Sequence, residues 1–181
     1  LYNLGKLDTF ALKGIDHLHN KQNFESLADI QNYLRENIPT DKTLDTVYKG
    51  HTGEWESFDY FRNLGYDVTV NPNPAEKGYD AIINGDKVDV ATSSDVNYIQ
   101  RKLDETPEDI KIVVPKDVEQ FFVDNDRIIV NPNLNPETTL SHTAETVEGL
   151  SDLGNFIDSI PVLTLGVSAI KNGVSVSKGN K

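Results

Sequence analysis

The dipeptide Asn84-Gly85 constrains what this chain can fold into more than any other short stretch of its sequence. Asn-Gly favours the two-residue turn of a β-hairpin, because both residues tolerate positive φ angles. The flanking segments YDAII and VDVATS are rich in the apolar and β-branched residues typical of strands. Each segment also carries one carboxylate, Asp80 before the turn and Asp89 after it. The sequence therefore predicts a half-buried hairpin that brings two acids close together.

Helix and strand patterns alternate around this hairpin. The expected elements are a helix over 51–64, strands over 66–70, 79–83 and 88–93, a helix over 94–106, a strand over 109–115, a short helix over 116–125 and a strand over 126–132. Antiparallel hairpin strands followed by strand–helix–strand units predict an α/β fold with a mixed sheet and helices packed on it.

The chain divides into three parts: a helical N-terminal segment over 1–48, an α/β core over 49–135, and a helical and apolar C-terminal tail over 136–181. The apolar run over 160–170 is shorter than the roughly 20 residues that span a bilayer. It is expected to be a packing segment or, alternatively, part of a stretch that contacts a membrane. The absence of Met fits a fragment of a longer polypeptide.

The N-terminal segment is expected to hold two helical pieces. Ser26 or Asn23 can cap the first, and the second, TLDTVYKG, is expected to close at Gly50. Three apolar residues share one face of the first helix: Leu27, Ile30 and Leu34.

The composition excludes several kinds of site. A net charge of −12 argues against general electrostatic attraction to nucleic acid, so such a function needs a local basic patch, bound metal ions or a cationic partner. The absence of Cys excludes disulfides and thiolate metal sites. The four histidines have no familiar zinc spacing, and the pair His17 and His19 indicates a solvated helix face.

The helix before Gly65 carries two acids on different faces. Glu54 shares the apolar face with Phe58, whereas Glu56 is rotated toward solvent. A carboxylate on the core-facing side costs several kcal/mol unless it meets a cation or a metal. Thr52 is the expected N-cap of this helix.

Strand geometry adds two further oxygen donors. Asp89 and Ala91 point to the same face of their strand, and Asp80 lies across the turn. Like charges that close repel each other unless something neutralises them. Three oxygen donors without soft ligands, from Glu54, Asp80 and Asp89, suit Mg²⁺ or Mn²⁺. Taken singly, an Asp beside a turn or a Glu at a helix start can also serve only the turn or the helix dipole.

The stretches GEWESFDYFRNLGYDV and GYDAIINGDKVDVATS together resemble the PD-(D/E)xK nuclease superfamily, over about residues 50–132. The resemblance implies a restriction-endonuclease-like αβββαβ core and metal-dependent hydrolysis of DNA phosphodiester bonds. It implies that Glu54, Asp80, Asp89 and the backbone carbonyl of Val90 hold the metal.

Ala91 departs from the family pattern, which requires Lys at this position. Three explanations stay open: an engineered Lys→Ala substitution, a lysine that has moved to Lys102 on the following helix, or a pseudo-nuclease without activity. Under the first explanation, Ala91→Lys creates cleavage. Lys87 shares the face of Asp89, and Gln100 occupies a position where related enzymes carry a polar site residue.

The resemblance implies an endonuclease impaired by Ala91, of the toxin, defence or phage-associated kind. Its expected partners are DNA and a cognate inhibitor or immunity protein. Its expected location is the cytoplasm, or a target cell's cytoplasm after delivery as part of a longer protein. The alternative is a non-catalytic pseudo-nuclease that binds protein or nucleic acid, which the acidic net charge favours.

Overall fold

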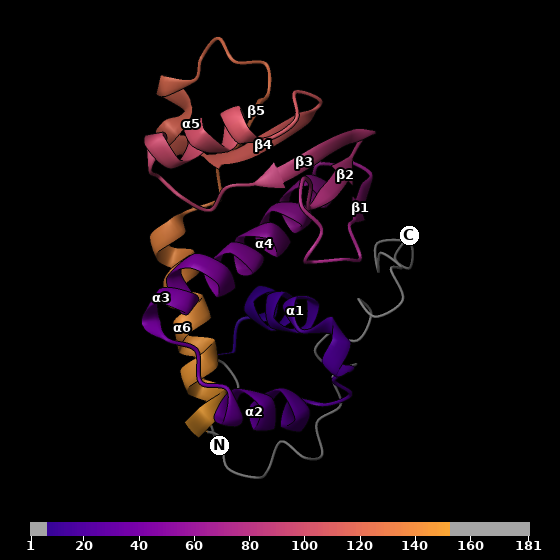
Figure 1. The fold of residues 1–181 in the computed structure, drawn as a ribbon, viewed down its shortest axis with the longest axis vertical. Coiled ribbons are helices and arrows are strands. Elements are labelled where there is room, and N and C mark those ends of the chain that lie inside the picture. The colour runs from indigo at the N-terminus through magenta and orange to yellow at the C-terminus, as the bar shows by residue number, and fades with distance from the viewer. Residues whose placement is uncertain (1–6, 153–181) are drawn as a thin grey trace. The chain divides into compact units, whose positions relative to one another are not determined.

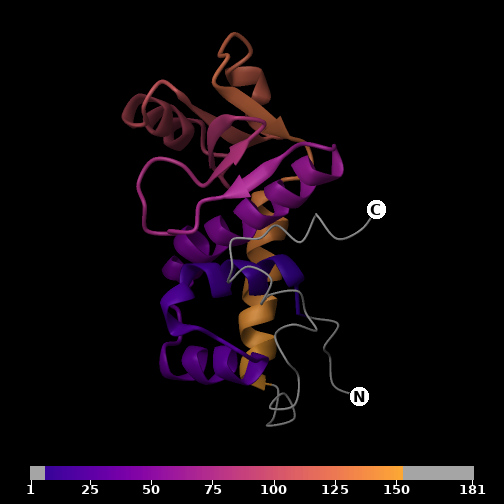
Figure 2. The same ribbon diagram turned by 90° about the vertical axis from the view of Figure 1, so that its right-hand side faces the viewer.

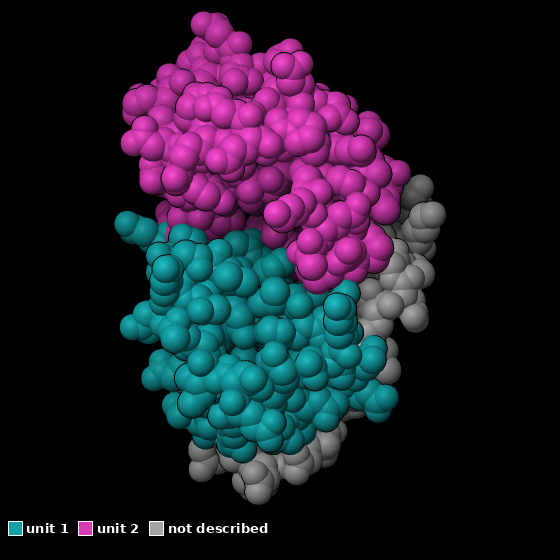
Figure 3. All heavy atoms as spheres, viewed as in Figure 1, with its two compact units in different colours: residues 1–52, 137–181 teal, residues 53–136 magenta. Residues whose placement is uncertain are grey.

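The computed structural model describes residues 7–152. The chain forms two compact units, shown in different colours in Figure 3. One unit joins residues 1–52 and 137–181, and the other holds residues 53–136. The predicted N-terminal segment and the first part of the predicted tail therefore belong to one unit, while most of the predicted core forms the other.

The first unit is helical. Its elements are α1 (Thr9–Leu18), η2 (Asn20–Gln22), α2 (Leu27–Glu36), α3 (Asp41–Thr43), the π-helical turn η3 (Leu44–Tyr48), the first four residues of α4 (Lys49–Asn63) and nearly all of α6 (Pro136–Asp152). Residues from both ends of the described chain share its apolar core: Leu12, Ile15, Phe24, Leu27, Ala28, Ile30, Leu34, Tyr48, Val147 and Leu150.

Helix α2 forms as predicted. Ser26 is its N-cap, and the Ser26 hydroxyl and the Asp29 carboxylate satisfy each other's backbone N–H groups in a capping box. The predicted apolar face is buried, since Leu27, Ile30 and Leu34 are all at most 1% exposed. Ser26, rather than Asn23, is therefore the cap.

The helix predicted to close at Gly50 does not close there. Helical structure continues from α3 through η3 into α4, so Thr52 lies inside a helix and is not an N-cap. The buried Thr52 hydroxyl donates to the Tyr48 carbonyl at 3.1 Å and accepts from Thr143 Oγ1 at 2.8 Å. A single Gly costs a helix only about 1 kcal/mol relative to Ala, which the packing of Tyr48 and Thr52 offsets.

The prediction that His17 and His19 lie on a solvated face is wrong for His17, which is 5% exposed. Its ring lies 6.2 Å from the His51 ring, and burial lowers the pKa of both residues to about 4. His19 is half-buried, and its Nε2 lies 2.8 Å from the Tyr48 hydroxyl. The sequence pattern missed this because α1 buries residues on a wider arc than its aliphatic positions indicate.

The second unit is an α/β structure built on a five-stranded mixed sheet, as predicted (Figures 1 and 2). The strand order is β1-β2-β3-β4-β5, with antiparallel pairing among the first three strands and parallel pairing among the last three. Its elements after α4 are β1 (Val68–Val70), β2 (Ala81–Ile83), β3 (Asp86–Val90), α5 (Val96–Glu105), β4 (Ile110–Pro115), η4 (Lys116–Phe121) and β5 (Ile128–Asn131).

The predicted hairpin is present at β2 and β3. Asn84 has φ 49° and Gly85 has φ 89°, the positive angles that a two-residue turn of this type requires. The register pairs Ala81 with Val88 and Ile83 with Asp86. This register places Asp80 and Asp89 one step beyond the last pair, directly opposite each other.

Helix α5 packs on the sheet through an apolar cluster. Its buried members are Ala91, Ile99, Leu103, Ile112, Val114, Val118 and Phe122. Strand β4 supplies two of them and is buried along nearly its whole length, as its continuous apolar sequence predicts. No helix within residues 7–152 combines the length and apolar character that crossing a membrane requires. The apolar run predicted over 160–170 lies outside the described residues.

Candidate active site at the end of the hairpin

Asp80 and Asp89 are in direct contact at the open end of the hairpin. The backbone N–H of Asp80 donates to the Val88 carbonyl at 2.7 Å, which continues the pairing just beyond β2. The Asp80 carboxylate accepts the N–H of Val90 at 2.7 Å. A side-chain hydrogen bond also joins Asp80 to Asp89. The hairpin register thus sets two carboxyl groups side by side, as its turn predicts.

Lys102 reaches the same place from helix α5. Its Nζ lies 2.8 Å from Oδ2 of Asp89, and the two side chains are only 21% and 16% exposed. The packing of Ile99 and Leu103 on the sheet holds this face of α5 against the hairpin. Burial acts to lower the pKa of Lys102, but the Asp89 carboxylate outweighs it, so the pKa lies above its ordinary value. Lys102 is therefore a charged partner of the acids.

Glu54 is the third acid of this group and comes from α4. It is half-buried, and burial followed by the Asp89 charge raises the pKa of Glu54 to about 8, while Lys102 acts in the opposite direction. Burial, Glu54 and Asp89 likewise raise the pKa of Asp80 well above its ordinary value, against the N–H of Val90. The structure therefore brings Glu54, Asp80, Asp89 and Lys102 into one interacting group with an excess of acids.

A close approach between α4 and the end of β3 fixes the position of Glu54. A Cβ atom added to Gly53 would lie 2.0 Å from Oγ1 of Thr92, so only Gly fits at this contact. Thr92 is buried, and its hydroxyl has no hydrogen-bond partner among the described residues. Sequence reasoning missed this contact. The sequence signal for this contact was Gly53, which directly precedes the predicted site residue Glu54.

Ala91, at the position where the family pattern has Lys, is completely buried. It belongs to the apolar cluster with Ile99 and Leu103, under α5. Its backbone N–H donates to the Val113 carbonyl at 2.8 Å, which extends the pairing of β3 with β4. A cation on the face of Asp89 therefore comes from the helix above Ala91 and not from the strand.

The remaining predicted candidates make other contacts. Gln100 lies on the exposed side of α5, where its amide donates to Asp104 at 2.9 Å. Lys87 is exposed, 3.8 Å from Asp109. Glu56 is half-buried, although the helical spacing placed it in solvent.

The chemistry of the group fits a divalent cation, although the side chains point elsewhere in this arrangement. Within residues 7–152, no three His, Cys, Asp or Glu side chains are arranged to hold a metal ion. Asp89 contacts Lys102, and Asp80 accepts from Val90. The donors are nevertheless all carboxylate oxygens, the ligands that Mg²⁺ and Mn²⁺ prefer. A bound cation would offset the burial and the repulsion between acids that together raise the pKa of Glu54 and of Asp80.

Comparison with known proteins yields no relative: no family model, no curated protein and no solved structure matches this chain. The function is therefore argued from the site itself.

Proposed function

We propose that residues 53–136 form the core of a metal-dependent nuclease, of the restriction-endonuclease-like kind, that hydrolyses phosphodiester bonds in DNA. The observation that carries this proposal is the 2.8 Å contact between Lys102 and Asp89, beside Asp80 and within the electrostatic influence of Glu54. Three carboxylates can hold a divalent metal ion, and one ammonium beside them can bind a phosphate, which together suit metal-assisted phosphoryl transfer. A solvated surface ion pair would need neither the burial nor the excess of acids.

Each residue has a defined part in this proposal. Glu54, Asp80 and Asp89 would hold Mg²⁺ or Mn²⁺, which supplies polarisation of the phosphate and a bound water of lowered pKa. Lys102 would donate to the phosphate oxygens, where a well-placed donor stabilises the transition state by about 3–4 kcal/mol. Asp89 positions Lys102 through their direct contact.

The burial of Ala91 supports one of the three explanations for the missing lysine. Ala91 is completely buried in the apolar cluster, so a lysine at position 91 would place its amine among apolar side chains, whereas the Lys102 ammonium lies beside Asp89. The functional lysine is therefore proposed to be Lys102, on α5. Under this proposal the chain is active as it stands, without any substitution at Ala91.

The test is cleavage of DNA and of RNA by the full chain with Mg²⁺ or Mn²⁺. Asp80→Asn and Lys102→Met should each lower the rate at least about a hundredfold, the equivalent of about 2.7 kcal/mol. The matched control is Lys111→Met. Lys111 also pairs with a carboxylate, Asp86 at 2.6 Å, but at the turn end of the hairpin. Its removal should leave the rate within about twofold.

Metal-dependent cleavage that Lys111→Met lowers as much as Lys102→Met would contradict the assignment of Lys102. Metal binding that Asp80→Asn abolishes, without cleavage of either nucleic acid, would favour the pseudo-nuclease. One observation favours that second candidate: the net charge of −12 suits a protein partner better than DNA.

A further inference from the structure

Strand β5 is an open edge of the sheet. Within residues 7–152 it pairs only with β4, with Ile112 opposite Ile128. The N–H of Ile112 donates to the Arg127 carbonyl at 2.7 Å. Since alternate residues of a parallel strand bond to the same neighbour, Ile129 also faces β4, while the backbones of Ile128 and Val130 face outward.

The outward backbone groups of β5 are largely free. The N–H of Ile128 donates to the Asn125 carbonyl at 3.2 Å. The carbonyl of Ile128 and both backbone groups of Val130 have no hydrogen bond to any residue in the described part of the chain. Three free groups in a row on an edge strand are a template for a further strand.

This edge lacks the charged side chains that often protect a sheet edge. Its side chains are two Ile, one Val and one Asn, with no charge among them. The preceding Arg127 turns inward and donates to four carbonyl oxygens of residues 103–110. The opposite edge, β1, has only three residues and is followed by Pro72 and Pro74. Pro132 likewise follows β5 directly, so the free backbone groups of this edge end at Val130.

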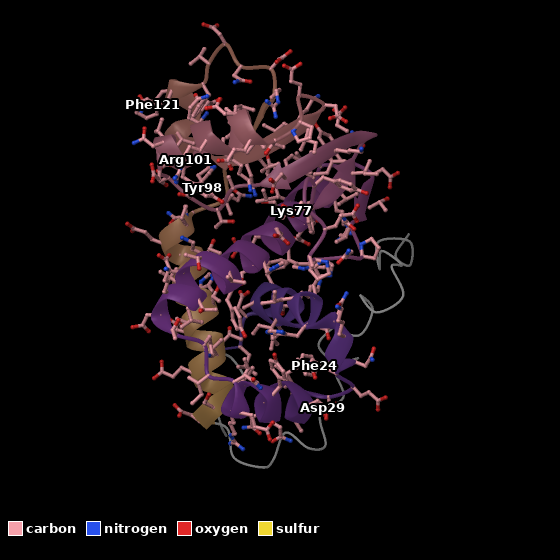
Figure 4. All side chains as sticks on the ribbon, in the orientation of Figure 1. Phe24, Asp29, Lys77, Tyr98, Arg101 and Phe121 are labelled. Atoms are coloured by element: carbon pink, nitrogen blue, oxygen red, sulfur yellow. The ribbon has the colours of Figure 1, made fainter. Side chains whose placement is uncertain are left out.

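A cavity of about 490 Å³ lies against β5. Ile128 and Val130 line it from the strand, and Phe122 and Val123 line it from the segment after η4. Val123 is 76% exposed, and Phe121, marked in Figure 4, is 59% exposed. The rest of the lining is polar, so a side chain from an added strand would find a pocket that is apolar on the side of these four lining residues.

The surroundings of this cavity are acidic. Asp117 and Glu119 line it, and the exposed Asp124 and Asp126 flank the lining residue Asn125 in the sequence. Lys116 is the only basic residue in the lining, and it already pairs with Glu119. A second copy of this chain would bring the same acids against these, so its pairing would meet like-charge repulsion.

We propose that β5 and the cavity beside it form a docking surface for a basic, extended segment of a partner protein. The segment adds a strand to β5 through the free groups of Ile128 and Val130, with an apolar side chain in the cavity. Its Lys or Arg side chains meet the surrounding carboxylates. This mode of recognition uses main-chain bonds for affinity and pockets for specificity. It does not depend on the proposed nuclease activity.

The probe is a fluorescent peptide of about nine residues that alternates Lys and Val, the length of a strand with short flanks. Fluorescence anisotropy with the full chain should show saturable binding. Val130→Pro removes the outward N–H at a position where an edge strand tolerates Pro, and should weaken binding at least about tenfold. Val123→Ser should weaken it about fivefold, whereas Ile38→Ser, at a residue of matched exposure (77%), should not change it.

Two altered peptides keep the test independent of the folding of any variant. The same peptide with alternate backbone amides N-methylated cannot complete a strand, and a peptide with Glu in place of Lys reverses the charge. Absence of binding by the Lys-Val peptide, or equal binding of the N-methylated one, overturns strand addition. Equal binding of the Glu-Val peptide overturns the basic partner. A dimer in sedimentation that Val130→Pro dissociates assigns the edge to a second copy and also overturns the proposal.

Discussion

Replacing Gly53 by Ala tests the close approach of α4 to the end of β3. The new Cβ would lie 2.0, 2.8 and 2.9 Å from three side-chain atoms of Thr92. Overpacking costs about 1–3 kcal/mol, and a contact as short as 2.0 Å places this case in the upper part, at about 2–3 kcal/mol, against the roughly 1 kcal/mol that Ala gains over Gly inside a helix. We therefore expect Gly53→Ala to destabilise the second unit by about 1–2 kcal/mol.

Gly50 in the same helix provides the matched control. A Cβ there meets no atom within 4 Å, so Gly50→Ala should stabilise by about 0.5–1 kcal/mol. The assay is urea unfolding followed by the fluorescence of the single tryptophan, Trp55, which is buried two residues from Gly53, and by circular dichroism for the helices. Adding Thr92→Ala to Gly53→Ala removes Oγ1 and Cγ2 of Thr92, the two atoms nearest to the new Cβ. The double variant should therefore recover part of the lost stability.

The same variants report on the site. Because Glu54 follows Gly53 directly, Gly53→Ala should weaken Mn²⁺ binding, whereas Gly50→Ala should not. If both substitutions stabilise the protein equally, the contact with Thr92 is not needed and the reasoning about Glu54 fails.

Three further predictions follow from the second unit. In a chelating buffer, the free energy of unfolding should fall as pH rises from about 5 to about 8. The pKa of Glu54 and that of Asp80 are raised in the folded state, so the folded protein holds these two protons more tightly than the unfolded chain does. The stabilisation that comes from the bound protons is lost when the two acids ionise. For Glu54 the change from 4.5 to about 8 sets an upper limit of about 5 kcal/mol, and urea unfolding of Glu54→Gln across this pH range should show a smaller slope. Arg127→Met should lower the free energy of unfolding by about 2–3 kcal/mol in the same assay, because four carbonyl oxygens lose a charged donor. The control is Arg101→Met, at an exposed position, which should change it by less than about 0.5 kcal/mol. Ala91→Lys should destabilise by about 2–4 kcal/mol, because it buries an amine in the apolar cluster; a stable variant with raised cleavage activity would instead support a silenced strand lysine.

Local patterns were sufficient to predict most of the second unit. The Asn84-Gly85 turn fixes the hairpin register, and that register alone sets Asp80 opposite Asp89. The helical spacing of α5 places Lys102 on the side of Ile99 and Leu103, but its contact with Asp89 depends on how α5 packs. Contacts outside the hairpin, such as the one between Lys102 and Asp89, join residues on different elements. Local sequence patterns therefore could not predict them.

The errors arose where packing outweighs local preference. Gly50 was expected to end a helix, yet its neighbours are held by tertiary contacts that a short window of sequence does not contain. His17 was expected in solvent, yet α1 is covered on several sides. The contact of Gly53 with Thr92 joins residues 39 positions apart and could not be derived from either segment alone.

The divided core of the first unit has a consequence for the order in which the chain folds during synthesis. Val147 and Leu150 complete a core that begins at Leu12, and the Thr146 hydroxyl accepts the N–H of Asp8 at 2.9 Å. All the strands of the second unit lie between these two parts. As the chain leaves the ribosome, residues 53–136 can therefore reach their folded state while the N-terminal helices still lack the partner that closes their core. The strands, the three acids and Lys102 are thus all synthesised before the residues of α6 that complete the core of the helical unit.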